Sequence, residues 1–210
     1  MKKILLVIGK LFSYIYPPTI LEKWERVKVY IFTGYKSRHF HSLGAHCTLG
    51  RHTTYIGEQY ITIGNNTHLG DHGRLTAYSY YPHTKQTFQP EIIIGNACSI
   101  GYQSHITAIN KIVIGNNVLT GPRVLITDNA HGASVDSILD IAPSKRKMIS
   151  TGPVLIEDNV WIGEGAMIMP NVHIGTGCIV AANSVVTKDI PPYSIAAGIP
   201  AKVIRTITKN

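Results

Sequence analysis

An aliphatic side chain recurs at every sixth residue over most of this chain, with small shifts of register near residues 55–56 and 112–114. A period of six does not match the 3.6-residue turn of an α-helix. Glycine often follows the aliphatic residue, and a helix would lose about 1 kcal/mol at each such position. The pattern therefore predicts short strands. Its positions are Leu43, Leu49, Ile63, Leu69, Ile94, Ile100, Ile106, Ile114, Thr120 (the one polar member), Ile126, Ile156, Ile162, Ile168, Ile174, Val180 and Val186.

The residue four places after each of these positions is nearly always small or β-branched. Short strands wound into a triangular coil would need such a residue where the chain turns a corner, with successive coils about 4.8 Å apart. All three cysteines fall in this phase, so we interpret them as small interior residues rather than ligands or nucleophiles. The corner positions are Cys47, Thr53, Thr67, Cys98, Ser104, Val118, Val124, Ala130, Val160, Ala166, Val172, Cys178 and Ser184.

Residues 1–40 lack the six-residue repeat. Apolar residues from Ile4 to Ile15 lie at helical spacing, prolines 17 and 18 end that segment, and residues 21–32 suggest a second helix. We expect 1–40 to form a helical cap on the open end of the coil. The alternative is contact of the first helix, which carries three lysines, with a membrane surface. No apolar run reaches the roughly 20 residues of a transmembrane helix.

The coil itself is predicted over 41–205, followed by a short tail, 206–210. Two segments, 71–91 and 131–153, interrupt the repeat and are predicted to be loop insertions. The first is rich in tyrosine and the second contains consecutive basic residues. Loops on a rigid scaffold often carry function, so both insertions are candidate site segments.

Composition excludes a disordered chain and points to an anionic partner. Hydrophobic residues make up 44% of the sequence, charged residues only 15%, and the formal net charge is +8. No nucleic-acid-binding module accompanies this charge, so we expect no nucleic-acid partner. Three cysteines without a CxxC pair fit a reducing compartment, which predicts a cytoplasmic protein.

Three phrases in the last third carry a family resemblance: D-N-V-W-I-G at 158–163, V-V-T-K-D-I-P-P at 185–192 and A-G-I-P-A-K-V-I at 197–204. With the hexapeptide pattern, they make the chain similar to the acetyl-CoA-dependent O-acetyltransferases of galactosides, maltose, nodulation sugars and xenobiotics. The resemblance is closest over 92–205. It implies an all-β fold, the left-handed parallel β-helix. The phrase I-T-D-N-A-H-G at 126–132 resembles the polysaccharide O-acetyltransferase branch.

The resemblance implies that His131 is the general base. A sugar hydroxyl is a poor nucleophile until its proton is removed as it attacks the thioester, and imidazole titrates near neutral pH. Because no serine or cysteine nucleophile is implied, we expect direct transfer in a ternary complex. Asp128 is a candidate for orienting the imidazole, and the alternative is that it caps a turn.

Binding of acetyl-CoA is expected in the last coils and the tail, where the resemblance places the cofactor segment. Cations there would meet the phosphates of coenzyme A, Trp161 would line the pantetheine groove, and small residues would let the pantetheine arm lie close to the coil. The predicted residues are Trp161, Gly163, Ala182, Thr187, Lys188, Lys202 and Arg205. The sequence assigns no role to Glu164.

Candidate acceptor residues are Asn110, whose place matches an acceptor-contacting asparagine of sugar acetyltransferases, and Tyr78 and His83 in the first insertion. Packing between subunits is the alternative for the insertion. The family resemblance implies a homotrimer with active sites between neighbouring coils. The expected acceptor is a sugar of a surface polysaccharide or its precursor, with contact at the inner face of the membrane as an added possibility.

Other functions remain open at this point. A xenobiotic or serine O-acetyltransferase would share the same phrases. A zinc enzyme of the γ-carbonic-anhydrase type shares the coil, but His41 and His46 lie at its entrance without a third ligand, so we expect no metal. A β-helical scaffold without catalysis is the remaining class.

Overall fold

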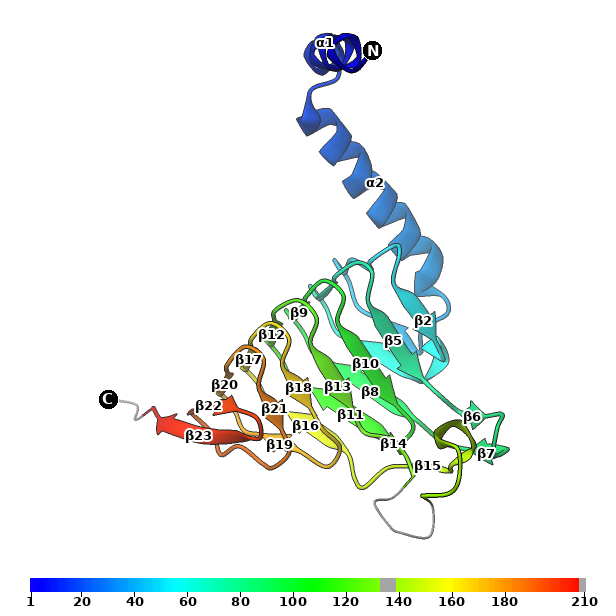
Figure 1. The fold of residues 1–210 in the computed structure, drawn as a ribbon, viewed down its shortest axis with the longest axis vertical. Helices are drawn as coiled ribbons and strands as arrows, with labels where there is room; N and C mark the ends of the chain where they lie inside the picture. Colours follow the sequence, from blue (N-terminus) through cyan, green and yellow to red (C-terminus); the bar gives the residue numbers. More distant parts are fainter. Residues whose placement is uncertain (133–138, 208–210) are drawn as a thin grey trace.

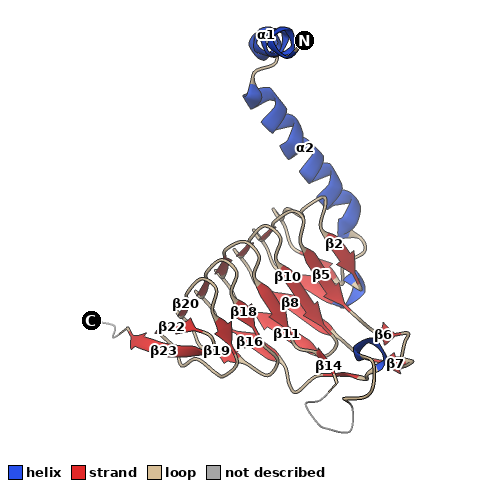
Figure 2. Ribbon diagram, viewed as in Figure 1, coloured by secondary structure: helices blue, strands red, loops and turns tan. Residues whose placement is uncertain are grey.

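The computed structural model describes residues 1–132 and 139–207. Three parallel sheets form the faces of a tapering triangular coil, and two helices project from its N-terminal end (Figures 1 and 2). This is the left-handed parallel β-helix that the family resemblance implies.

Each sheet collects one strand from each coil. The first sheet contains β1 (Ser42–Leu43), β3 (Ile61–Ile63), β8 (Glu91–Ile94), β11 (Lys111–Ile114), β16 (Val154–Ile156) and β19 (His173–Ile174). The second contains β2 (Thr54–Ile56), β5 (Arg74–Ala77), β10 (His105–Ala108), β13 (Leu125–Thr127), β18 (Met167–Ile168) and β21 (Val185–Val186). The third contains β4 (His68–Leu69), β9 (Ser99–Ile100), β12 (Leu119–Thr120), β17 (Trp161–Ile162), β20 (Ile179–Val180), β22 (Ser194–Gly198) and the antiparallel β23 (Ala201–Thr206).

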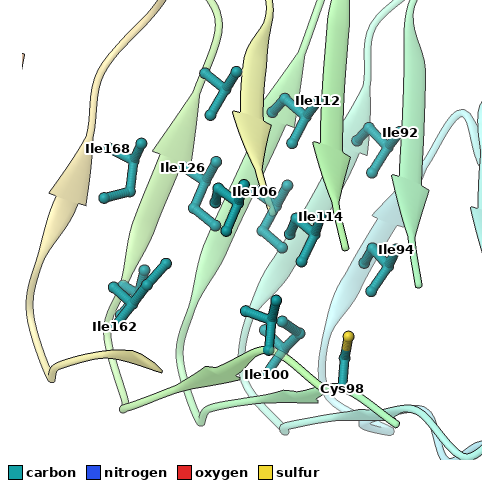
Figure 3. Packing of buried hydrophobic residues seen from close by; sticks show 14 of the residues in the cluster. Ile92, Ile94, Cys98, Ile100, Ile106, Ile112, Ile114, Ile126, Ile162 and Ile168 are labelled. Carbon is teal, nitrogen blue, oxygen red and sulfur yellow. The ribbon is translucent and has the colours of Figure 1, made fainter. Parts of the chain in front are cut away.

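The aliphatic residues of the six-residue register stack as ladders inside the coil. On the first sheet, Ile63, Ile94, Ile114, Ile156 and Ile174 are aligned strand to strand, and none is more than 1% exposed. Figure 3 shows the same stacking on the second sheet, and it shows Cys98 within the core. The cysteines are buried and free, as the pattern predicts.

The corners require a left-handed backbone, which explains a second regularity of the sequence. The third residue after the aliphatic one has a positive φ in most coils, for example 54° at Asn66 and 58° at Asn159. Asparagine and glycine tolerate this conformation better than other residues. At one corner a ladder of side-chain carbonyls joins neighbouring coils, with Asn96 Oδ1 accepting from the amide of Asn65 and Asn116 Oδ1 accepting from that of Asn96.

The helical cap expected over 1–40 forms only in part. The structure has α1 (Lys2–Ile15) and α2 (Pro18–Ser37), and only α2 meets the coil, through the ion pair of Glu25 with Arg51 and through its C-terminal part. There, buried Thr33 accepts a hydrogen bond from the amide of Leu49 at 2.9 Å. The helix α1 has no buried residue, so it caps nothing in the described chain.

Both insertions begin or end at other residues than the predicted bounds, 71–91 and 131–153. Residues 74–77 form β5 and belong to the coil, so the first insertion is shorter than 71–91 and consists mainly of the hairpin β6 (Tyr80–Tyr81) and β7 (Gln86–Thr87). The second starts with β14 (Ala130–His131) and returns through β15 (Met148–Ile149), with a 3₁₀ turn at Pro143–Lys145; a similar turn, Glu58–Tyr60, lies beside α2. Residues 133–138 lie outside the described residues. At the C-terminus β23 includes Thr206, the first residue of the predicted tail.

Candidate active site

The two insertions, about sixty residues apart in sequence, contact each other beside the second sheet. The Gln86 side chain bonds to both backbone groups of Met148: Nε2 donates to the carbonyl oxygen at 3.0 Å, and Oε1 accepts from the amide at 2.8 Å. The Tyr81 hydroxyl donates to the carbonyl of Ser144 at 2.6 Å. These bonds hold the hairpin β6–β7 against β15, so that the two insertions form one wall.

A cavity of about 420 Å³ lies between this wall and the second sheet. Aromatic rings dominate its lining, with a few polar and charged groups among them, which is the composition expected of a small-molecule site. The lining consists of Arg74, Tyr78, Tyr80, Tyr81, Pro82, His83, Phe88, His105, Thr107, Ile109, Asn129, His131 and Met148.

His131 lies in this cavity, at the point where the chain leaves the coil. In β14 it is paired with Met148 of β15, and its ring packs edge-on against Tyr81, with 5.6 Å between centroids and 63° between planes. The preceding Ala130 occupies a corner phase but is exposed, because the second insertion starts there. The imidazole is therefore held between two insertions and remains accessible.

Among the described residues, Asp128 hydrogen-bonds to the coil and not to His131. Its carboxylate is fully buried and accepts hydrogen bonds from the amides of Ile109 and Asn110, both at 2.9 Å, and from Asn129 Nδ2 at 3.0 Å. The amides belong to the preceding coil. Asp128 thus caps a turn and ties two coils together below His131, which is the alternative that the sequence left open.

Two of the three predicted acceptor residues line the cavity with His131. They are Tyr78 and His83. Asn110 does not: it is exposed, and its side-chain amide donates to Ser150 Oγ at 3.3 Å.

The sequence did not indicate Arg74 and His105, which line the cavity from adjacent strands of the second sheet and are aligned in register. Burial lowers the pKa of the His105 imidazole, and the charge of Arg74 lowers it further. His105 occupies an outward position of the six-residue repeat, where a histidine at the protein surface is expected. Only the insertion that covers this face distinguishes it from other outward histidines.

A groove of about 570 Å³ crosses the third sheet and brings together three of the predicted cofactor residues, Trp161, Gly163 and Ala182. The need for Gly163 has another origin, however, since a Cβ there would lie 2.5 Å from the amide nitrogen of Ala182 in the next coil. The other four, Thr187, Lys188, Lys202 and Arg205, are exposed but lie outside the groove lining.

Glu164, also in the groove lining, forms an ion pair with Arg123 of the preceding coil. The groove and the His131 cavity share no lining residue and lie on different sheets of the coil. One copy of the chain therefore does not bring the two together.

Among the described residues, one group has ligand atoms close enough for a metal ion: His52, Asp71 and His72. His52 Nδ1 and Asp71 Oδ2 are 2.7 Å apart, and the two imidazoles stack with centroids 4.9 Å apart. This group lies outside the cavity and includes neither His41 nor His46.

Comparison with known proteins places these features in a family context. The profile "Bacterial transferase hexapeptide (six repeats)" matches residues 153–188. A candidate lipopolysaccharide-biosynthesis O-acetyl transferase of Escherichia coli, WbbJ, is 32% identical over 164 residues, covering 76% of this chain and 79% of the relative. A candidate acetyltransferase of Schizosaccharomyces pombe is 45% identical over 96 residues, or 46% of this chain, and the match spans only 44% of that relative.

Among solved structures, AntD, an N-acyltransferase from Bacillus cereus in complex with dTDP and 3-hydroxybutyryl-CoA, superimposes with a TM-score of 0.67. The match covers 83% of this chain and 87% of AntD at 20% identity, so it shows the shared fold alone.

Proposed function

Because the chain belongs to the hexapeptide-repeat acetyltransferase family, we propose that it transfers an acetyl group from acetyl-CoA to a sugar hydroxyl. The observation that carries the proposal is the position of His131, accessible in an aromatic-lined cavity. WbbJ is named for lipopolysaccharide biosynthesis, which supports a surface polysaccharide or its precursor as the acceptor.

In the proposed reaction His131 accepts the proton of the sugar hydroxyl while the hydroxyl oxygen attacks the carbonyl carbon of the thioester. A C–O bond forms, the C–S bond then breaks, and the imidazolium returns its proton to the leaving thiolate of coenzyme A. General acid–base catalysis of this kind typically contributes about 10²–10⁴-fold. No covalent acetyl-enzyme is needed, so transfer is direct.

The cavity suits a sugar acceptor with an anionic substituent. The rings of Tyr78 and Tyr81 offer flat apolar surfaces, and the guanidinium of Arg74 offers a planar cation for a phosphate or carboxylate. Tyr81 also packs against His131, which places the acceptor surface directly beside the proposed base.

We propose that the groove on the third sheet receives acetyl-CoA, with Trp161 and Ala182 along the pantetheine arm and Thr187, Lys188, Lys202 and Arg205 near its outer end. Since cavity and groove lie on different faces, a homotrimer would complete each site by placing the groove of one copy beside the cavity of the next. An outward-facing ladder on the first sheet, Ile93, Val113 and Leu155, offers an apolar surface for such contact.

The location we propose is the cytoplasm. The three thiols are free and buried, in keeping with a reducing compartment. The chain would therefore act before the polysaccharide is exported.

The first test is His131→Ala. We expect turnover to fall by about 10²-fold or more, because the proton acceptor is removed, while thermal unfolding stays unchanged. Release of the coenzyme A thiol from acetyl-CoA is followed across nucleotide sugars, oligosaccharides, serine and xenobiotics. His68→Ala is the matched control, since His68 is an exposed histidine of the third sheet, away from the cavity, and its ring is hydrogen-bonded to Thr48. Retention of most activity by the His131 variant would remove the proposed mechanism.

The shared site is tested by mixing two inactive chains. Ala182→Trp fills the groove of one chain and His131→Ala removes the base of the other, so neither works alone. In randomly mixed oligomers about a quarter of the interfaces pair an intact groove with an intact histidine, and activity should recover to about that fraction. Absence of recovery, with mixing confirmed by light scattering and mass spectrometry, would place cavity and groove function in one chain.

A further inference from the structure

The helix α1 carries a continuous apolar surface that nothing in the described chain covers. Its apolar side chains recur at helical spacing, and the lysines lie on the opposite side. No residue of α1 is buried, and Figure 1 shows the helix at the far end of α2, away from the coil. The exposed apolar residues include Ile4 (65%), Leu5 (61%), Ile8 (50%), Leu11 (61%), Phe12 (59%) and Ile15 (70%).

Charge identifies the surface that would cover this helix. Residues 1–21 contain Lys2, Lys3 and Lys10 and neither aspartate nor glutamate. A helix with one apolar face and a basic opposite face binds membranes that contain anionic lipid, because burial of the apolar face and attraction of the lysines act together. We propose that α1 lies in the plane of an anionic lipid membrane and anchors the coil to its surface.

The dimensions of α1 favour this orientation over a span. Its 14 residues extend about 21 Å, whereas the hydrocarbon core of a bilayer is about 30 Å thick. Among the described residues no single helix is long and apolar enough to cross a membrane, although α1 and α2 together meet the length and composition criteria as a bent pair. Against a joint span, α2 carries Glu22, Glu25 and Arg26, and its C-terminal end is bonded to the coil through Thr33.

The junction between the helices holds α1 in a suitable position. The axes of the two helices meet at 70°, at the pair of prolines 17 and 18. With α2 standing away from the coil, α1 lies across its tip and reaches a flat surface without interference from the sheets (Figure 1). Tyr14, Tyr16 and Trp24 are exposed around this junction, and Tyr and Trp prefer the membrane–water interface.

The test is co-sedimentation of the full chain with vesicles of phosphatidylcholine alone or with one-third phosphatidylglycerol. Two variants each add one positive charge to α1: Ile8→Lys on the apolar face and Ser13→Lys on the polar face. We expect the natural chain and Ser13→Lys to sediment with the anionic vesicles, and Ile8→Lys to bind at least about fivefold more weakly, because only this substitution interrupts the apolar face. Binding should fall at 0.5 M salt and on neutral vesicles.

Equal sedimentation of the two variants, or no binding by the natural chain, would overturn the proposal. Light scattering without vesicles tests the other occupant, a second copy of the chain: if the natural chain forms a larger oligomer than Ile8→Lys, with vesicle binding absent in both, the apolar face is a protein interface. Thiol release from acetyl-CoA in solution is measured in parallel. It should be the same in all three chains, so failure of the membrane proposal leaves the proposed enzymatic function untouched.

Discussion

Isoleucines of the coil and isoleucines of α1 lie in opposite surroundings. Ile114 of β11 is 1% exposed, and Ile8 of α1 is 50% exposed. In the coil, backbone hydrogen bonds such as that from Gly115 N to the Ile156 carbonyl, at 2.7 Å, set each coil on the next and bring identical side chains into contact. A helix has satisfied its own backbone and needs a partner for its apolar face. In the six-residue repeat each coil therefore packs against the next copy of the same pattern. The apolar spacing of α1 indicates that the helix has a packing partner but does not say which.

The largest difference between the coil and α1 is expected when an isoleucine of each is replaced by alanine. Ile114→Ala should lower the free energy of unfolding by about 2–5 kcal/mol, because most of an aliphatic side chain is removed from between Ile94 and Ile156 and a cavity is left. Ile8→Ala should change it by less than about 0.5 kcal/mol. Urea unfolding followed by circular dichroism measures both. A comparable loss from Ile8→Ala would show that α1 packs on the coil in solution, contrary to the structure.

The same contrast explains which parts of the fold the sequence could predict. Stacked coils repeat one environment many times, so a single spacing rule predicts the buried position of Ile63 as well as that of Ile174. The left-handed corners add a second rule in the later coils, where asparagine or glycine lies three residues after the aliphatic position from Asn159 to Asn183, whereas earlier coils also place residues such as His72 and Arg123 there. The extent to which 1–40 caps the coil was not predictable, because it depends on a contact between Thr33 and Leu49 that follows no repeat.

Some residues of the candidate site could be predicted from the sequence, and others could not. His131 was accessible to sequence analysis because a family phrase surrounds it. Tyr81 and Arg74 were not assigned to the site, since their closeness to His131 depends on how two non-repetitive insertions fold against each other, through bonds such as that between Gln86 and Met148. The role of Asp128 was undecided because a short polar phrase does not show whether a carboxylate faces the cavity or the backbone amides of the coil below.

A smaller effect is expected at the junction between the two regions. Lys36, in the last turn of α2, forms an ion pair with Glu58 of the coil, and both side chains are largely buried (19% and 16% exposed). Glu58→Gln should lower the free energy of unfolding by about 1 kcal/mol at pH 7, since the charge that pairs with Lys36 is lost. The matched control is Glu25→Gln: Glu25 pairs with Arg51 across the same junction but is 58% exposed, and its removal should cost less.

The pH dependence of the free energy of unfolding tests whether the charge of Glu58 joins α2 to the coil. Burial by itself raises the pKa of the Glu58 carboxyl, but the hydrogen bond and charge of Lys36, with the nearby His39, outweigh it and hold the pKa below its ordinary value of about 4.3. The folded chain therefore favours the ionised form. Stabilisation is complete above about pH 5 and is lost as pH falls through the lowered pKa. The difference between the natural chain and Glu58→Gln should thus shrink between pH 7 and pH 3. A difference independent of pH would mean that the Glu58 side chain acts by packing, not by charge, in joining α2 to the coil.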